Sequence, residues 1–472
     1  MSASGLAALE ARLAEDLALL EYPPPDWVVP HRRPDGKRVL EVAIIGAGMV
    51  GQAVAFALMR DGVPNILCLD AAPEGQEGPW LTYARMLTLR SPKFLQGPAM
   101  GIGALTFRAW YTAQHGAAGW EALDKPDRAT WMAYLAWYRS VLALPVRNNA
   151  SVTRIVPEGA LYALHLAGGE TLWARHVVLA TGRDGLGGAY VPAEFAHLPP
   201  TRCAHSRDAI DFSALAGRRV AVIGAGASAI DNAATALEAG AAEVTLLVRR
   251  AELPRINKFT ATVAPGFTHG LETATPAWRR DFYAYMFEAQ VPIPRDSLLR
   301  FASHRPRARL WLGAPVREAR LQGDTVMLAT PKGTLEADFV ILGTGFVQDI
   351  SRRPELAEVA PQIALWRDHD SQAGMFADYP WLDAAFAFTP RPGVTAPHLA
   401  RLHCFNFAAT ASHGKVSGDI PAISDGVARL SRGIAAALFN ADIEAQFGRI
   451  KAFSRAELQG DEWPEVPARA AE

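Results

Sequence analysis

The stretch that determines the fold runs from Val39 to Gly51 and reads VLEVAIIGAGMVG. Its apolar part predicts a buried parallel strand, and its glycines predict the turn that leads into a helix. In such a turn the first Gly allows the sharp bend, the second lets the backbone approach a pyrophosphate, and the third lets the helix pack closely on the strand. We therefore expect Gly46, Gly48 and Gly51 to bind the phosphates of a dinucleotide.

A second version of the same signal occupies residues 219–229 and reads RVAVIGAGASA. Here Gly224, Gly226 and Ala229 stand at the three small-residue positions, and Ser228 lies at the expected start of the helix. One such match is weak evidence, whereas two matches with suitable flanks indicate a protein that binds two dinucleotides. The predicted fold class is α/β, with two Rossmann-like dinucleotide-binding domains.

The residues at the end of the next strand distinguish the two sites. About 20 residues after the first glycines, a strand ends at Asp70, whose carboxylate can accept hydrogen bonds from a ribose diol. The equivalent strand of the second site ends at Arg249 and Arg250, whose guanidinium groups favour a 2′-phosphate. The first site therefore suits FAD or NAD and the second suits NADPH. The alternative, that these charged residues simply end strands at the surface, is less favoured at this spacing.

The composition agrees with a large enzyme that contains several domains. The chain has 472 residues, half of them hydrophobic, and a net charge of −1 at pH 7. This balance gives no reason to expect nucleic acid or an acidic membrane surface as a partner, and no apolar segment is a good membrane span. The three cysteines are widely spaced and form no Cys-x-x-Cys motif, disulfide framework or zinc site. We therefore expect a cytoplasmic protein without a metal site, and dithiol flavoprotein reductases are disfavoured.

Two more strands end in small-residue turns and mark the domain boundaries. The turns are Thr181-Gly182 and Gly343-Thr344-Gly345, where only small residues leave room for a ligand. The expected organisation is a FAD domain in two pieces with the NADPH domain inserted between them. The predicted ranges are 1–37 for an N-terminal helical extension, 38–200 and 338–472 for the FAD domain, and 201–337 for the NADPH domain. The amphipathic helix of the extension would pack on the flavin domain or on another subunit.

These motifs resemble those of the flavin-dependent monooxygenases with two dinucleotide sites. That group contains the flavin-containing, the N-hydroxylating and the Baeyer–Villiger monooxygenases, and the resemblance covers roughly residues 38 to 430. The segment His205-Ser206-Arg207-Asp208 resembles the linker signature of the flavin-containing group, and this implies that His205 and Ser206 position NADP+ and the linker. Trp80 resembles the Trp in the Gly-rich turn that follows the FAD-ribose carboxylate; a core aromatic is the equal alternative.

Departures from the family signatures leave the subgroup open. Pro199 and Thr201 stand where the Baeyer–Villiger signature has Phe and Gly, which makes that chemistry less favoured. Arg90 stands where flavin-containing monooxygenases have an active-site Asn before a Pro-Lys pair. The resemblance therefore implies that Arg90 contacts the flavin or the peroxide, with a surface salt bridge as the alternative, and that substrate handling differs.

The segment from Asn406 to Asp419 is small, polar and followed by a helix starting near Pro421. In related flavoproteins the N-terminus of the C-terminal helix points at the flavin, where the positive end of its dipole would stabilise a reduced, anionic ring. We therefore expect this loop beside the isoalloxazine. Asn406 or His413 would face the substrate, and Asp419 would contact the cofactor.

The resemblance implies a reaction whose difficult step belongs to the cofactors. NADPH would reduce FAD, O2 would add as a C4a-hydroperoxide, and one oxygen atom would pass to a small-molecule substrate. Oxygenation of N or S is slightly favoured over Baeyer–Villiger insertion. An NADPH oxidase or flavin reductase is a competing class, and a redox sensor is less favoured. The substrate and the oligomeric state stay open, although a homodimer would be common for the family.

Overall fold

The computed structural model describes residues 3–463, and its two parallel sheets confirm the predicted α/β class. Parallel pairing joins β3, β2, β1 and β6 in that order, and β17 pairs with the second half of β6. Strands β5 and β4 extend the sheet in antiparallel pairing. The strands are β1 (Leu40–Ile45), β2 (Ile66–Leu69), β3 (Val146–Arg147), β4 (Val152–Glu158), β5 (Leu161–Leu166), β6 (Thr171–Leu179) and β17 (Leu402–Cys404).

Helix α2 (Met49–Arg60) explains why the first Gly-rich turn is so constrained. Every residue from Met49 to Leu58 is buried, because the helix lies between the sheet and α10 (Ile423–Ala441). A side chain at Gly51 would overlap the carbonyl oxygen of Gly46, so the third Gly permits the close packing that the sequence predicted.

The second parallel sheet has the order β11-β10-β9-β15-β8 and a hydrophobic core of its own around α5 (Ala227–Glu238). Helix α8 (Arg295–Ala302) packs on α5, and a three-stranded antiparallel sheet lies beside this domain. The strands of the parallel sheet are β8 (Cys203–His205), β9 (Arg219–Ile223), β10 (Glu243–Leu247), β11 (Ala308–Trp311) and β15 (Phe339–Leu342). The strands of the antiparallel sheet are β12 (Glu318–Gln322), β13 (Thr325–Thr330) and β14 (Gly333–Ala337).

The end of the inserted domain lies later than the expected position 337. Strand β15 lies within the range expected for the returning flavin domain, but it pairs with β9 and β8 in the second sheet. The strand that rejoins the first sheet is β17. The two crossings between domains are β7 (Gly187–Ala189) and β16 (Phe346–Gln348), which pair with each other as an antiparallel ribbon.

The N-terminal helix α1 (Ala3–Leu19) packs on its own chain. Leu9 and Leu13 are buried against the flavin-domain core, which includes α3 (Phe107–Ala122), and Glu10 accepts a hydrogen bond of 3.0 Å from the indole of Trp137 in α4 (Arg128–Val141). This placement selects the first of the two alternatives for the extension. Between residues 3 and 463, no helix has both the length and the apolar character needed to cross a membrane.

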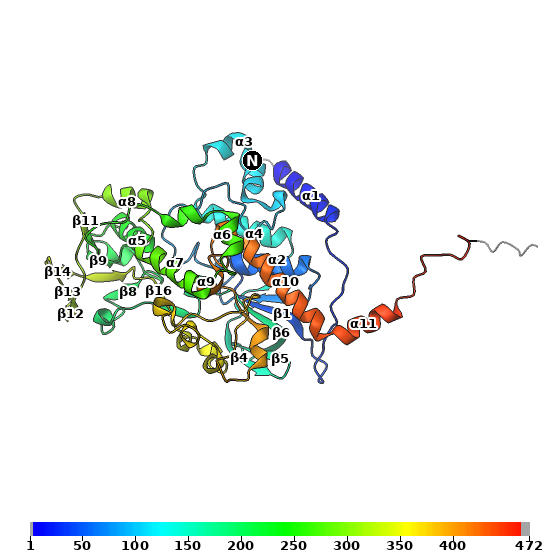
Figure 1. Ribbon diagram of the computed structural model, residues 1–472. Helices are drawn as coiled ribbons and strands as arrows, with labels where there is room; N and C mark the ends of the chain where they lie inside the picture. Colours follow the sequence, from blue (N-terminus) through cyan, green and yellow to red (C-terminus); the bar gives the residue numbers. More distant parts are fainter. Residues whose placement is uncertain (1–2, 464–472) are drawn as a thin grey trace, which may run out of the picture.

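The C-terminal part crosses back over both domains before it ends in two helices. Helix α7 (Pro276–Ala289) of the insert packs against α9 (Thr410–His413), with α6 (Pro265–Gly270) just before it in the chain. Tyr283 shares a hydrophobic cluster with Trp366 and Phe376 of the long connection from β16 to β17. Helix α11 (Ile443–Ala452) follows α10 and extends away from the body of the molecule (Figure 1).

Candidate active site

A cleft of about 2240 Å³ lies between the two domains, and both Gly-rich turns open into it. The turns follow β1 and β9, so the cleft lies at the carboxyl ends of the two parallel sheets, where open α/β folds bind ligands. Gly46, Gly48, Gly224 and Gly226 line it. The structure thus brings the two predicted dinucleotide sites to one cavity.

The first Gly-rich turn has the shape that a pyrophosphate requires. Gly46 has φ of +104°, and a side chain there would lie 2.5 Å from the carbonyl oxygen of Ala180. Gly48 precedes the first turn of α2, whose backbone N–H groups face the cleft as an anion site. The residues present at this turn therefore fit the phosphates of FAD.

Asp70 and Trp80 line the cleft near this turn. The Asp70 carboxylate accepts hydrogen bonds from the backbone N–H of Ala47 at 2.7 Å and of Ala72 at 2.8 Å. These contacts fix the carboxylate beside the phosphate turn, as a ribose ligand would need. The Trp80 ring contacts Trp131 edge to face at 6.2 Å and is only partly buried.

The second Gly-rich turn repeats the arrangement of the first. Gly224 has φ of +135°, and a side chain there would overlap the carbonyl oxygen of Gly343. Ser228 is exposed at the start of α5, and Arg249 lines the cleft without a hydrogen bond or ion pair to any residue between 3 and 463. Arg250 donates a hydrogen bond of 2.6 Å to the carbonyl oxygen of Glu288, so α7 holds its guanidinium group.

The small-residue turns and the linker lie where the two domains meet. Thr181, Gly182, Ser206, Thr344 and Gly345 all line the cleft. His205 does not, because its ring is buried beside Phe346 and its Nδ1 accepts a hydrogen bond from the backbone N–H of Arg207. Burial lowers the pKa of His205, which keeps the ring neutral in the linker.

Two ion pairs cross the cleft from one domain to the other. Arg90 of the flavin domain contacts Asp231 of α5 at 3.4 Å, and Arg207 of the linker contacts Asp184. The Asp231 side chain is buried, and burial lowers the pKa of Arg90 although Asp231 opposes this. Arg90 thus lies in the cleft, as expected, and also joins the domains.

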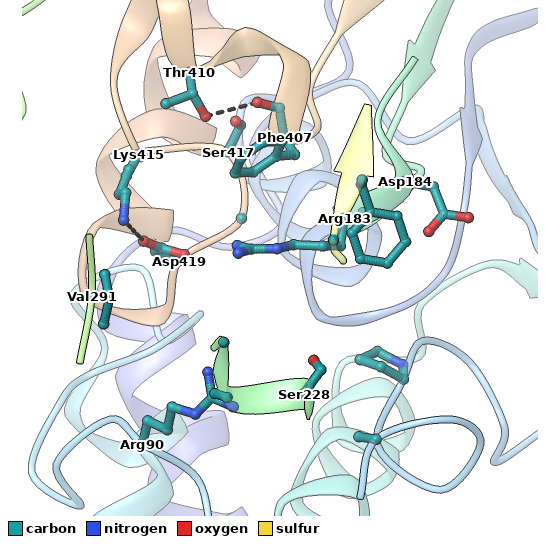
Figure 2. A pocket seen from close by; sticks show the side chains of 18 of the residues that line it. Arg90, Arg183, Asp184, Ser228, Val291, Phe407, Thr410, Lys415, Ser417 and Asp419 are labelled. Carbon is teal, nitrogen blue, oxygen red and sulfur yellow. Dashed lines mark hydrogen bonds and ion pairs between the residues drawn. The ribbon is translucent and has the colours of Figure 1, made fainter. Parts of the chain in front are cut away.

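One wall of the cleft carries two cations, Arg183 and Lys415, that the sequence analysis did not predict as site residues. Figure 2 shows Arg183 extending across the cleft toward the loop of Asp419, with Arg90 and Ser228 on the opposite side. The Arg183 guanidinium lies 4.7 Å from the centre of the Phe407 ring and has no ion-pair partner among residues 3–463. Lys415 forms an ion pair of 3.6 Å with Asp419. Asp419 therefore already has an ion-pair partner other than Arg183.

Asn406 has a different orientation from the one expected. Its side chain is fully buried and donates hydrogen bonds to Leu179 O at 3.2 Å and Thr181 Oγ1 at 3.1 Å, while its amide oxygen accepts one from Ala408 N at 3.0 Å. The amide therefore fixes the loop to the end of β6 and does not line the cleft. Its role is to position neighbouring residues.

His413 is buried in the wall of the cleft at the end of α9. Its ring lies 4.0 Å from Phe386, and Nδ1 is 3.5 Å from a carboxylate oxygen of Glu272, which pairs with Arg429. Among the described residues neither ring nitrogen has a hydrogen-bond partner. Burial lowers the pKa of His413 to about 4, so the imidazole is neutral at physiological pH.

Some residues of the site left a signal in the sequence and others did not. Arg183 was not singled out from the sequence, but it directly follows the Thr181-Gly182 turn, so that motif could have located it at the cleft. Glu272 belongs to the other domain, and only tertiary contact brings it to His413. No group of His, Cys, Asp and Glu between residues 3 and 463 could hold a metal ion, and the three cysteines do not line the cleft.

Comparisons with known proteins agree with this geometry. The family model for pyridine nucleotide-disulphide oxidoreductases matches residues 43–291. A FAD-dependent urate hydroxylase of Xanthomonas campestris pv. campestris is 42% identical over 468 residues, which are 98% of each chain. Among solved structures, an ornithine hydroxylase from Pseudomonas aeruginosa has a TM-score of 0.66 at 19% identity over 85% of this chain and 100% of its own. An L-lysine 6-monooxygenase from Pseudomonas syringae has a TM-score of 0.64 at 20% identity, covering 85% and 99%.

Proposed function

The chain belongs to the pyridine nucleotide-disulphide oxidoreductase family and is a flavin-dependent monooxygenase, and from this premise we propose that it hydroxylates urate or a closely related purine anion with FAD, NADPH and O2. The similarity to a urate hydroxylase along the whole chain carries the proposal. The charge of the cleft supports it, because urate is a planar anion at neutral pH and the Arg183 cation has no ion-pair partner among residues 3–463.

The residues that would hold the cofactors follow from the two turns. Gly46, Gly48 and the start of α2 would bind the FAD pyrophosphate, Asp70 its ribose, and Arg249 the 2′-phosphate of NADPH. The bound cofactors would supply the chemistry that the family resemblance implies, with hydride from NADPH and activation of O2 as a C4a-hydroperoxide. The 3-10 turn at Ile420–Ala422 and helix α10 begin at the cleft, where the positive end of the helix would stabilise an anionic flavin.

Arg183 and Phe407 would bind the substrate together. A guanidinium group can bind an anionic heterocycle through charge and paired hydrogen bonds, and the Phe407 ring beside it restricts the orientation of the guanidinium. Lys415 contacts Asp419 and lies 3.4 Å from the centre of the Phe259 ring, so it offsets the charge of that carboxylate in this wall. A wall of this charge suits an anion better than a protonated amine, which disfavours N-oxygenation of an alkyl amine.

The activity is tested with the purified FAD-loaded protein. We expect urate to be consumed in a one-to-one ratio with NADPH and O2, with little hydrogen peroxide, and we expect ornithine, lysine and a simple sulfide to give no coupled turnover. NADPH oxidation that is equally fast without urate and yields stoichiometric peroxide would support the oxidase alternative instead. Coupled turnover of an amine or a sulfide in place of urate would support heteroatom oxygenation.

The Arg183→Met variant tests the substrate site. Loss of a charge-assisted contact costs about 1.5–3 kcal/mol, so the KM for urate should rise roughly tenfold to a hundredfold while the KM for NADPH stays constant. Arg183→Lys should keep part of the affinity because it keeps the charge. Arg202→Met removes a partly buried arginine outside the cleft that pairs with Asp324, and it serves as the control. A rise in the KM for NADPH alone would reassign Arg183 to the coenzyme.

The coenzyme preference is tested at Arg249. Arg249→Ala should raise the KM for NADPH about tenfold or more and leave the KM for NADH nearly unchanged, because only NADPH carries the 2′-phosphate. Arg250→Ala should have a smaller effect, since Glu288 already holds that guanidinium. Arg309→Ala, a variant of an exposed arginine that pairs with Glu243, is the matched control. Equal losses for both coenzymes would remove the assignment.

A further inference from the structure

Helix α11 carries an apolar stripe on the side that faces away from the chain. Ile443, Phe447 and Ile450 are exposed at 49%, 50% and 66%. Their spacing of four and three residues places them on one face of the helix. Figure 1 shows that α11 extends from the body of the molecule, which agrees with the exposure of these side chains.

The side of α11 next to the stripe is held by hydrogen bonds, so the exposure of the stripe does not come from a loose helix. Gln446 and Arg449 donate hydrogen bonds of 2.8 and 2.6 Å to the carbonyl oxygen of Trp27. Asp442, just before the helix, forms an ion pair of 2.7 Å with the buried Arg175. These contacts fix which side of α11 points outward.

The area of the stripe matches what a stable pair of proteins buries. Phe439 in the last turn of α10 and Phe453 just after α11 flank the stripe in sequence and are exposed at 43% and 74%. The five side chains together expose on the order of 600 Å², which is at the upper limit for one patch on a monomer. Two such surfaces would bury about 1200 Å², the lower end of the range for specific interfaces.

The charges beside the stripe are self-complementary. Glu444 lies in the first turn of α11 and Lys451 in the last turn, seven residues later, so both lie along the same edge of the stripe. When two such helices pair in antiparallel orientation, matching edges meet and each Glu444 faces a Lys451 of the other copy. The Lys451 ammonium already lies 4.0 Å from the centre of the Phe447 ring, next to the stripe.

The same charges argue against a membrane as the occupant. Helices that bind anionic bilayers are rich in Lys and Arg on the polar face. The segment 442–463 has an acidic excess instead, with the bases Arg449, Lys451 and Arg455 against the acids Asp442, Glu444, Glu457, Asp461 and Glu462.

We propose that two copies of this chain pair through α11, with the helices antiparallel about a twofold axis near Phe447, the apolar stripes in contact, and Glu444 of each copy facing Lys451 of the other. The interface is isologous, because the same residues serve both sides of it. It is separate from the cleft, so loss of the pair leaves cofactor binding intact.

The first experiment measures the mass of the full-length, FAD-loaded protein by sedimentation at several concentrations. We expect a dimer for the unchanged chain and a monomer for Phe447→Asp combined with Ile450→Asp, with the same flavin spectrum and melting temperature. Leu321→Asp, a change at an equally exposed apolar residue of β12, should leave the dimer intact. A monomer at all concentrations, or a dimer that the double variant does not dissociate, would overturn the proposal. So would binding of the unchanged chain to anionic vesicles through Phe447.

The second experiment tests the antiparallel orientation by exchanging charges. Glu444→Lys or Lys451→Glu alone creates two like-charge contacts in a twofold pair, so each should raise the dissociation constant at least tenfold. The two changes together restore opposite charges and should bring the constant back to within about threefold of the original. Single changes without effect, or a double variant as weak as the single ones, would exclude this pairing.

Discussion

The two cofactor sites use Gly and Ala in opposite order at two equivalent positions. At the first site Gly51 ends the phosphate turn and Ala180 follows the returning strand β6, whereas at the second site Ala229 and Gly343 take those roles. A side chain at Gly343 would lie 2.5 Å from the methyl group of Ala229, which is closer than such atoms approach. The Gly at position 343, where the first site has Ala180, is therefore explained by a neighbour more than 100 residues away in sequence.

A double-mutant cycle tests this exchange. Gly343→Ala should destabilise the protein by roughly 1–3 kcal/mol through overpacking. Ala229→Gly alone should cost about 0.5–1 kcal/mol, because it places Gly in a helix. The combined variant should be more stable than the sum of the two single effects predicts, as measured by urea unfolding. Purely additive effects would contradict a direct contact between the two residues.

At the residue scale, the sequence predicted which positions line the cleft better than it predicted which side chains point into it. Gly46, Asp70, Ser228 and Arg249 all line the cleft, as local spacing indicated. Asn406 lies in the expected loop, but its amide is used by Leu179 and Thr181, residues distant in sequence. Such orientation depends on tertiary hydrogen bonds, which no local pattern contains.

At the element scale, a buried pair of histidines joins β6 and β17. His403 Nδ1 donates to the carbonyl oxygen of Ala385 at 2.9 Å, so its Nε2 accepts from His176 Nδ1 at 3.0 Å. Both rings are buried, and burial lowers the pKa of each below its ordinary value. The pair therefore holds the returning strand only while both rings are neutral.

The stability of the protein should consequently depend on pH below the ordinary histidine range. Below about pH 6.5 these histidines take up protons in the unfolded chain but stay neutral in the folded protein. The free energy of unfolding therefore falls by about 1.4 kcal/mol per pH unit for each proton. His176→Leu combined with His403→Gln should flatten this slope between pH 7 and 5 in urea titrations. His269→Gln, a variant of an exposed residue of α6, should leave it unchanged. Equal slopes in all three proteins would exclude the pair as a source.

The element scale also shows why one domain boundary was misplaced. The segments that end at Gly182 and Gly345 have the same pattern, a buried strand followed by small residues. The pattern reports that a strand ends beside a Gly-rich turn, and both sheets contain such a strand. Only the register of β15 against β9, with Leu342 beside Ile223, assigns the second one to the inserted domain.

On the scale of the whole molecule, the cleft exists because two domains that could bind their cofactors separately face each other. The pairs Arg90 with Asp231 and Arg207 with Asp184 cross between them, and α7 of the insert packs on α9 of the flavin domain. The sequence predicted both domains from their turns, because each turn is local. The relative orientation of the two domains could not be predicted, because the contacts that set it join segments distant in sequence.

The ribbon of β7 and β16 gives the inserted domain its entrance and its exit at one point, with Ala189 directly beside Phe346. A segment whose two ends meet can be gained, lost or replaced in one genetic event without breaking the sheet that receives it. The domain between the two ribbon strands can therefore be exchanged as a single segment. If this domain were exchanged between relatives, the preference for a coenzyme would move with it, while the flavin domain would stay unchanged.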